Sequence, residues 1–347
     1  MVVALVAGLV CLILGAEALV RGASRLAARA GIPPLIIGLT VVAFGTSSPE
    51  LAVSVKAAFD DQAAIALGNV VGSNIFNVLF ILGLSALVVP LVVARQLIRL
   101  DIPVMIGLSL LVWLLAANGQ LGRLEGLLLV AGLVGYLGVL WRQARREAVP
   151  ESDASRVVSG HWAWQVALVV GGLALLVLGS RWLVDGAVSL AQALGVGEQV
   201  IGLTLVAAGT SLPEVVTSLV AALRGERDIA VGNVVGSNVF NLLGVLGLTV
   251  ALAPAGIQVP PAMIAFDLPV MLAVALACLP LGFTGGTIVR WEGAVLFGYY
   301  LAYTLYLILA SAHHAALPAF ATVMLYFVVP ITVLTLAVVA IQEARRR

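Results

Sequence analysis

The sequence predicts an all-α, polytopic membrane protein built from two inverted five-helix repeats, a core of ten spans, with an eleventh C-terminal span. Three observations lead to this fold class. Of the 347 residues, 62% are hydrophobic and only 10% are charged, too few to coat a globule in water. Eleven apolar stretches are long enough to cross a bilayer, and long segments of the first half recur in the second half.

The apolar stretches are the candidate spans. A helix needs about 20 residues to cross a hydrocarbon layer of about 30 Å. The candidates lie at residues 1–20, 33–58, 65–90, 102–117, 124–141, 163–184, 198–223, 229–253, 262–283, 291–311 and 317–340. The first lacks the basic leader and cleavage site of a signal peptide, and we interpret it as a retained span.

The basic residues predict the orientation. With the N-terminus outside, fifteen of the 18 Lys and Arg residues fall in cytoplasmic loops, and Lys56, Arg123 and Arg181 stay on the other side. Basic residues collect on the cytoplasmic side of membrane proteins, so the C-terminal tail is expected there too. A net charge of +1 gives no indication of a nucleic acid partner. With no organelle-targeting leader, we expect the cytoplasmic membrane of a prokaryote.

An internal repeat organises the chain. An offset of 164 residues aligns "GLTVVAFGTSSPE" with "GLTLVAAGTSLPE" and "GNVVGSNIFN" with "GNVVGSNVFN". The predicted parts are the first repeat (1–141), a cytoplasmic linker (142–161), the second repeat (162–311), and the eleventh span with a basic tail (312–347). Five spans are an odd number, so the second copy crosses the membrane upside down. Inverted repeats with interrupted helices indicate a midplane substrate site and alternating access.

The first repeated block, "GTSSPE" and "GTSLPE", places a helix breaker and a carboxylate inside a span. Proline has no backbone N–H, so it opens the helix and frees a carbonyl four residues earlier. Spacings of three and four put two hydroxyls and the carboxylate on one helical face. These residues are Thr46, Ser47 and Glu50 in the first copy, and Thr210, Ser211 and Glu214 in the second. A glutamate at the bilayer centre is costly, which favours a functional role for both.

The second repeated block adds neutral oxygen ligands. Ser73 and Asn77 lie four residues apart, as do Ser237 and Asn241, and the glycines of each block allow two helices to approach closely. An all-oxygen set suits sodium or calcium and disfavours zinc or copper. Hydrogen bonding between helices is the alternative role for such hydroxyls and amides. Outside the two blocks, Asp101 and Asp267 precede a proline at a span start and are expected to be helix N-caps.

These paired motifs resemble the two alpha-repeats of the cation/calcium exchanger superfamily, most closely its prokaryotic sodium/calcium exchanger branch, over residues 1–311. The resemblance implies a core of ten helices, with ion ligands from spans 2, 3, 7 and 8. It places these ligands on Thr46, Ser47, Glu50, Ser73, Asn77, Thr210, Ser211, Glu214, Ser237 and Asn241, and on the carbonyls of Ala43 and Ala207. One departure concerns Asn241, where some family members carry aspartate.

The expected function is secondary antiport of calcium against sodium at a site with two glutamates. No cofactor is expected, because calcium and sodium are the transported ions; the bilayer is the other partner, and the oligomeric state is not indicated. Proton/calcium antiport, or antiport of another divalent ion, is an alternative, although hydroxyls and amides favour sodium. An intramembrane hydrolase using Ser47 or Ser211 is a second alternative, but no histidine or lysine occurs within the blocks to act as a base.

Overall fold

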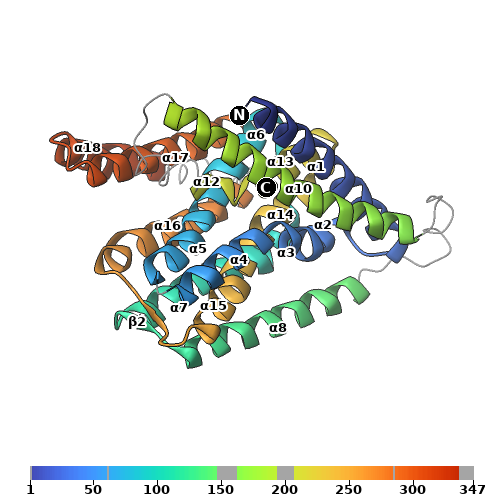
Figure 1. Ribbon diagram of the computed structural model, residues 1–347, viewed down its shortest axis with the longest axis horizontal. Coiled ribbons are helices and arrows are strands. Elements are labelled where there is room, and N and C mark those ends of the chain that lie inside the picture. Colours follow the sequence, from blue (N-terminus) through green and yellow to red (C-terminus); the bar gives the residue numbers. More distant parts are fainter. Residues whose placement is uncertain (1, 61, 147–161, 194–206, 284–285, 336–347) are drawn as a thin grey trace.

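The computed structural model describes residues 2–60, 62–146, 162–193, 207–283 and 286–335. Helices dominate this part of the chain (Figure 1), and η denotes π-helical stretches. The first half contains α1 (Val2–Ala30), α2 (Pro34–Ile37), η1 (Gly38–Val42), α3 (Ala43–Thr46), α4 (Ser48–Phe59), α5 (Ala63–Phe76), η2 (Asn77–Leu82), α6 (Gly83–Val88), β1 (Leu91–Val92), η3 (Leu97–Asp101), α7 (Ile102–Ala116), β2 (Gln120–Leu121) and α8 (Arg123–Arg146).

The second half repeats this order. It contains α10 (Trp162–Ala193), α12 (Ala207–Gly209), α13 (Leu212–Leu223), α14 (Arg227–Phe240), η5 (Asn241–Leu246), α15 (Gly247–Leu252), β3 (Ile257–Gln258), η6 (Met263–Asp267), α16 (Leu268–Phe283), β4 (Thr287–Ile288), α17 (Arg290–Ser311), α18 (Leu317–Val323) and η7 (Met324–Val328).

Nine helices among the described residues are long and apolar enough to cross a membrane, and the bent pair Pro34–Thr46 and Ser48–Phe59 makes a tenth. These ten correspond to ten of the eleven predicted spans. The remaining one, predicted at 198–223, is described only from residue 207, where it contributes α12 and α13. The predicted linker beyond residue 146, the end of the eleventh span and the basic tail also lie outside the described residues. The class of fold is confirmed, while the count of eleven stays a prediction.

The core of the bundle is formed by the third and eighth spans. Every residue from Ile229 to Gly247, in α14, η5 and the start of α15, is buried. Its counterpart α5–η2 lies beside it and is buried over most of its length. Both spans pass from α-helix into π-helix at an asparagine, Asn77 in one and Asn241 in the other. Short π-helical stretches widen a helix by one residue and are frequent at functional sites.

The helices α1 and α10 run antiparallel, side by side along one edge of the molecule (Figure 1). Glycines allow this close approach. A Cβ atom added to Gly8 would lie 2.8 Å from the carbonyl oxygen of Gly179, and one added to Gly15 would lie 2.8 Å from that of Gly172. Backbone therefore touches backbone along the pair, which is how small residues pack helices in membranes.

Two short strand pairs join the halves at opposite ends of the spans. β1 pairs antiparallel with β4, and β2 pairs antiparallel with β3. The first pair joins the segments after the third and ninth predicted spans, and the second joins those after the fourth and eighth. In a chain that alternates direction at every span, each pair lies on one side of the membrane, as the inverted threading requires.

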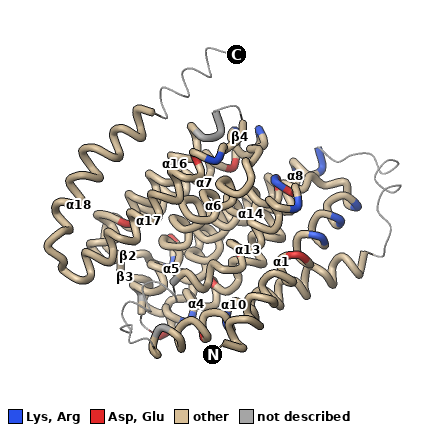
Figure 2. The backbone as a smooth tube through the Cα atoms, turned by 90° about the horizontal axis from the view of Figure 1, so that it is seen from above, with Lys and Arg blue, Asp and Glu red and all other residues tan. Residues whose placement is uncertain are grey.

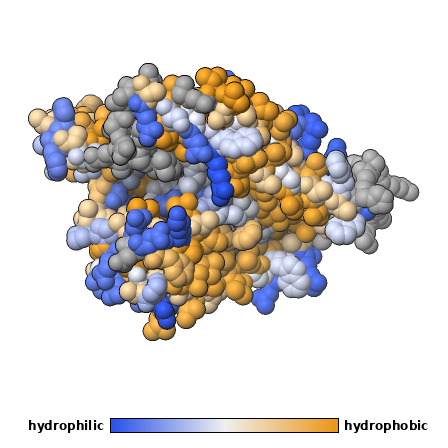
Figure 3. Space-filling model, viewed as in Figure 1, coloured by the Kyte–Doolittle hydropathy of each residue, from blue (hydrophilic) through white to orange (hydrophobic). Residues whose placement is uncertain are grey.

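Apolar side chains cover much of the outer surface, as expected for a protein surrounded by lipid. Figure 3 shows a broad hydrophobic band across the visible face, with hydrophilic residues toward its ends. The outermost helix, α18–η7, has no buried residue in its described part, and Tyr326 is 76% exposed. Charged residues gather instead near helix ends, and Figure 2 shows Lys and Arg around the ends of α1 and α8 and near β4.

The prediction that Asp101 and Asp267 are helix N-caps is wrong. Each ends a π-helical stretch that continues directly into the next helix, and Asp101 has helical backbone angles and no capping hydrogen bond. Their carboxylates accept instead from tyrosines 35 or 36 residues later. Tyr136 donates to Asp101 across 2.9 Å, and Tyr303 donates to Asp267 across 2.9 Å. A helix that begins one turn before the aspartate leaves no free N–H for it to cap.

Candidate cation site

Two interrupted helices form the first wall of the site. In the first repeat, α3 ends at Thr46 and α4 begins at Ser48, and the helix bends by 44° between them. Ser47, at the break, has φ −82° and ψ 6°, and Pro49 occupies the first turn of α4. Ser211 has φ −91° and ψ 7° at the same point of the second repeat, before Pro213. The missing proline N–H and the proline ring open the same turn in both copies.

The carboxylates of the two repeats each receive a hydrogen bond from the other repeat. Glu50 and Glu214 lie in the first turn of α4 and α13 and are 0% and 1% exposed. Ser211 Oγ donates to Glu50 Oε1 across 2.8 Å, and Ser47 Oγ donates to Glu214 Oε1 across 3.0 Å. The first turn of a helix carries partial positive charge, which stabilises a carboxylate there.

The buried spans α5–η2 and α14–η5 form the second wall. Ser73, Asn77, Ser237 and Asn241 are all buried in it. Ser211 Oγ also lies 3.1 Å from Ser73 Oγ, which joins this wall to the broken helix.

Five buried oxygens of the predicted ligands have no hydrogen-bond partner among the described residues. They are Oε2 of Glu50, Oε2 of Glu214, Oδ1 of Asn77, Oδ1 of Asn241 and Oγ of Ser237. Leaving buried acceptors unsatisfied costs about 1 to 3 kcal/mol for each group, and more for charged groups. Carboxylate, amide and hydroxyl oxygens are ligands for sodium and calcium. Within the described part of the chain, no group of three His, Cys, Asp or Glu side chains offers an alternative metal site.

Thr46, Thr210 and Ala43, three further predicted ligands, lie in the same breaks but already have partners. Thr46 Oγ1 lies 3.1 Å from Asn233 Oδ1, and Thr210 Oγ1 lies 3.3 Å from Asn69 Oδ1. The carbonyl of Ala43 accepts the Ser47 N–H at 3.0 Å and lies 3.3 Å from Thr46 Oγ1. Ala207 begins α12, and its side chain is outside the described part.

Two asparagines that were not predicted tie each glutamate to its neighbouring span. Asn69 Nδ2 donates to the backbone carbonyl of Glu50 at 3.1 Å and to Ser54 Oγ at 2.9 Å. Asn233 Nδ2 does the same for Glu214, at 3.4 Å, and for Ser218, at 2.9 Å. The available signal was their exact repetition within "GNVVGSN", because both asparagines occupy the second position of the block.

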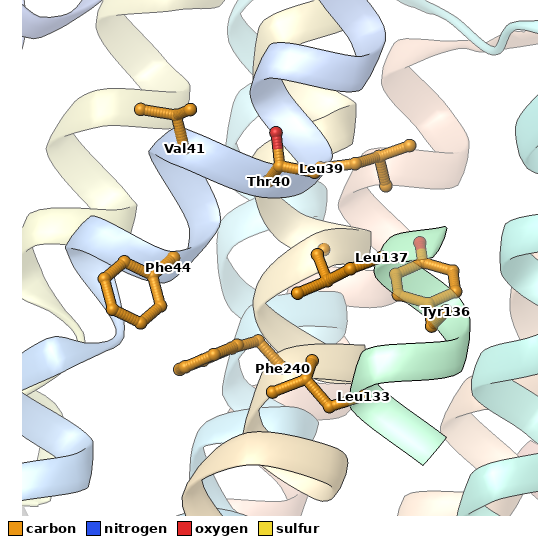
Figure 4. Close-up of a pocket in the computed structure, with 9 residues that line it drawn as sticks. Leu39, Thr40, Val41, Phe44, Leu133, Tyr136, Leu137 and Phe240 are labelled. Atoms are coloured by element: carbon orange, nitrogen blue, oxygen red, sulfur yellow. The ribbon is translucent and has the colours of Figure 1, made fainter. Parts of the chain in front are cut away.

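An apolar cavity of about 240 Å³ lies beside the first break, and Figure 4 shows its lining from three helices. The second span contributes Leu39, Thr40, Val41 and Phe44, α8 contributes Leu133, Tyr136 and Leu137, and α14 contributes Gly236 and Phe240. Its lining contains no carboxylate, and its Thr40 hydroxyl is bonded to the Ile36 carbonyl at 2.6 Å. The cavity therefore lacks the oxygen ligands that the cation site offers. The two are adjacent, because Gly236 lines the cavity and Ser237, the next residue, belongs to the candidate cation site.

Inverted halves, each with a broken helix and a buried glutamate, define the class of protein: a polytopic secondary transporter of small ions. Comparison with known proteins identifies the family. The sequence model of the sodium/calcium exchanger protein family matches residues 1–142 and 164–309, so the chain belongs to this family.

Relatives of known name agree with this assignment. The putative antiporter CaxA of Alkalimonas amylolytica is 41% identical over 313 residues, which cover 88% of this chain and 97% of that protein. The sodium/calcium exchanger MaX1 of Methanosarcina acetivorans is 35% identical over 339 residues, covering 86% and 96%. A solved structure of the sodium-calcium exchanger NCX_Mj superposes with a TM-score of 0.75 at 29% identity, covering 86% of this chain and 96% of that one.

The protein is therefore a multi-pass membrane antiporter of the cation/calcium class, and a transporter, not an enzyme. Exchangers of this family transport ions and use no cofactor. The hydrolase alternative is overturned by this membership. The local geometry agrees, because the hydroxyls of Ser47 and Ser211 donate to carboxylates and not to a histidine or lysine.

Proposed function

We propose that the protein exchanges calcium for sodium at one shared site between the two broken helices, centred on Glu50 and Glu214. The observation that carries this proposal is the set of five buried oxygens without hydrogen-bond partners among the described residues, two of them carboxylate oxygens. A hard cation would satisfy these oxygens, and removing it would leave them unsatisfied. Both ions would thus compete for the same two glutamates.

The proposed ligands come from both repeats. Glu50 and Glu214 supply the charge, and the neutral oxygens complete the coordination of one calcium ion or of several sodium ions. The neutral set is Thr46, Ser47, Ser73, Asn77, Thr210, Ser211, Ser237 and Asn241, with the carbonyls of Ala43 and Ala207.

Charge balance supports electrogenic exchange. Two ionised glutamates neutralise one calcium ion, so the calcium-loaded site has no net charge. Three sodium ions in the same site would leave one positive charge. Moving that charge across a potential of about 100 mV corresponds to about 2.3 kcal/mol, so the membrane potential would bias the direction of exchange.

The neutral oxygens favour sodium over protons as the coupling ion. A proton needs only a carboxylate oxygen, whereas a sodium ion needs several oxygen ligands. Serine hydroxyls reach the glutamates from the opposite repeat, and Ser211 also contacts Ser73, an arrangement that proton binding would not require. Proton coupling is the alternative outcome of the experiment below.

Alternating access would come from movement of the α1–α10 pair relative to the core. The glycine-lined contact between α1 and α10 holds the two helices together as one unit that could move as a rigid body. In this scheme residues 1–141 and 162–311 are the two inverted repeats, residues 142–161 link them, and residues 312–347 add the last span and tail. We place the protein in the cytoplasmic membrane of a prokaryote, with the N-terminus outside and the C-terminus in the cytoplasm.

The test is uptake of radioactive calcium into proteoliposomes preloaded with sodium, potassium or choline, with a separate pH-gradient arm. The proposal expects uptake only with an outward sodium gradient, and faster uptake when the interior is positive. Uptake that follows the pH gradient and ignores sodium would replace sodium coupling by proton coupling. Uptake driven by neither gradient would contradict exchange of either kind.

A further inference from the structure

We propose that Asn74 and Asn238, which are not in the predicted ligand set, are positioning residues that fix the amide orientation of Asn77 and Asn241. Through them, both ligand amides present oxygen and not N–H to the ion. This inference rests on the proposed function in one respect, namely that the site holds a cation. Asn74 and Asn238 are 3% and 2% exposed and lie between the two central spans.

The orientation starts at two backbone carbonyls. Asn74 Nδ2 lies 3.4 Å from the carbonyl oxygen of Asn238, and Asn238 Nδ2 lies 3.4 Å from the carbonyl oxygen of Asn74. A carbonyl oxygen can only accept a hydrogen bond, so both amides must turn their NH₂ groups toward it. A thioether sulfur reinforces each choice as a weak acceptor. Met271 Sδ lies 3.7 Å from Asn74 Nδ2, and Met105 Sδ lies 3.4 Å from Asn238 Nδ2.

The orientation of Asn74 and Asn238 determines that of the predicted ligands Asn77 and Asn241. Because their NH₂ groups point to the backbone carbonyls, Asn238 and Asn74 direct Oδ1 toward the other repeat. Asn77 Nδ2 donates to Asn238 Oδ1 at 2.9 Å, and Asn241 Nδ2 donates to Asn74 Oδ1 at 3.2 Å. The amide oxygens of Asn77 and Asn241 therefore form the free ends of the two chains of hydrogen bonds. Both are buried and have no hydrogen-bond partner among the described residues.

The orientation matters because the two ends of an asparagine amide are nearly the same size. Rotation by half a turn exchanges an acceptor for a donor at almost no steric cost. Turned the wrong way, Asn77 or Asn241 would direct N–H groups toward a cation and would remove one ligand. A carboxylate has no such ambiguity, since both of its ends are oxygen. This difference provides a test that separates positioning from packing.

The experiment is a double-mutant cycle between Asn74→Leu and Asn241→Asp, with calcium affinity measured by calorimetry in detergent and by the calcium KM of flux. Leucine removes the acceptor that holds Asn241. The aspartate needs no such acceptor. We expect Asn74→Leu to weaken calcium binding about tenfold beside Asn241, and less than about twofold beside the aspartate. An equal loss in both backgrounds would overturn the proposal and make Asn74 a packing residue.

Two further variants keep the test decisive. Met271→Leu removes the sulfur contact on the same amide and leaves the carbonyl acceptor, so we expect calcium affinity within about twofold of the starting protein. If Asn74→Leu does not fold, the equivalent double-mutant cycle of Asn238→Leu with Asn77→Asp measures the same coupling in the other repeat. Equal losses there would overturn the proposal as well.

The two proposals fail differently. Calorimetry measures calcium binding whether or not transport is coupled to sodium. A protein that binds calcium but shows no sodium-driven flux would contradict the proposed exchange, and the double-mutant cycle could still be measured. Conversely, sodium-driven flux with no coupling between positions 74 and 241 would retain the exchange and overturn the amide orientation.

Discussion

Around the buried glutamates, the two repeats carry the same contacts at equivalent positions. Ser211 donates to Glu50 in one repeat as Ser47 donates to Glu214 in the other. The bonds of Asn69 to Ser54 and of Asn233 to Ser218 are both 2.9 Å long. The aspartates at the ends of η3 and η6 repeat this pattern too, because Tyr136 donates to Asp101 and Tyr303 donates to Asp267.

At the ends of the predicted spans, equivalent positions instead carry opposite charges. Glu17 and Arg21 of α1 correspond to Arg181 and Asp185 of α10, and Arg224 corresponds to Asp60. Glu17 pairs with both Arg21 and Arg224. Among the described residues, no ion pair joins Arg181 to Asp60.

This difference separates two kinds of constraint. In the proposed function, a residue of the midplane site meets the same ions whichever way its repeat is inserted, so the two copies need the same chemistry there. A residue at the end of a span meets one side of the membrane only, and in two of the three pairs the basic member, Arg21 or Arg224, is the one on the predicted cytoplasmic side. Substitutions at equivalent positions should therefore have equal effects near the glutamates and unequal, small effects at the ends.

The largest effect is expected from the glutamates. Glu50→Gln and Glu214→Gln should each lower sodium-dependent calcium flux roughly 100-fold or more, because one carboxylate cannot balance a divalent ion in a buried site. Proteoliposome flux measures this. Glu125→Gln in α8 is the matched control, since Glu125 lies outside the site and accepts a hydrogen bond from the Gly122 N–H. Retained flux in either glutamine variant would contradict the shared site.

A charge added at the second wall should have the next largest effect. Asn77→Asp and Asn241→Asp each raise the number of carboxylates from two to three, and we expect each to tighten calcium binding about tenfold, because ligand charge tunes calcium affinity. Calorimetry with calcium checks both variants. A large gain at one position with none at the other would show that the repeats are not equivalent in the site.

Adding a methyl group between α1 and α10 should destabilise the protein equally from either repeat. A Cβ atom at Gly15 would lie 2.8 Å from the Gly172 carbonyl oxygen, and one at Gly172 would lie 2.7 Å from that of Gly15. We expect Gly15→Ala and Gly172→Ala to lower the free energy of unfolding by about 1 to 3 kcal/mol each. Thermal unfolding in detergent measures this, and Gly138→Ala in α8, with open space within 4 Å, is the control. Equal melting temperatures for all three would contradict the close packing.

The smallest effect is expected at the ends of the predicted spans. Glu17 and Arg224 are partly exposed, with 23% and 51% of their side chains accessible, and such pairs contribute between zero and about 1 kcal/mol. Arg224→Ala should therefore lower the melting temperature slightly at low salt and not at high salt, and Asp60→Ala should not change it. A loss at Arg224 as large as that at Gly15 would mean that the ion pair is a main support of α1.

The sequence by itself determined the features that depend on composition and short spacing. Apolar length predicted the spans, the repeat predicted inverted halves, and Pro49 and Pro213 predicted the positions where the helices are interrupted. The grouping of Ser47 with Glu50 on one face was also readable, because helical period is a local property.

Only the tertiary structure decided which groups meet across the repeats. Ser47 donates not to Glu50, three residues away, but to Glu214, and Asp101 accepts from Tyr136 where local spacing predicted an N-cap. The asparagines at positions 69, 74, 233 and 238 acquired their roles in the same way. Their partners lie on other helices, and hydrogen bonds between residues far apart in the chain depend on how whole helices pack, which no local pattern specifies.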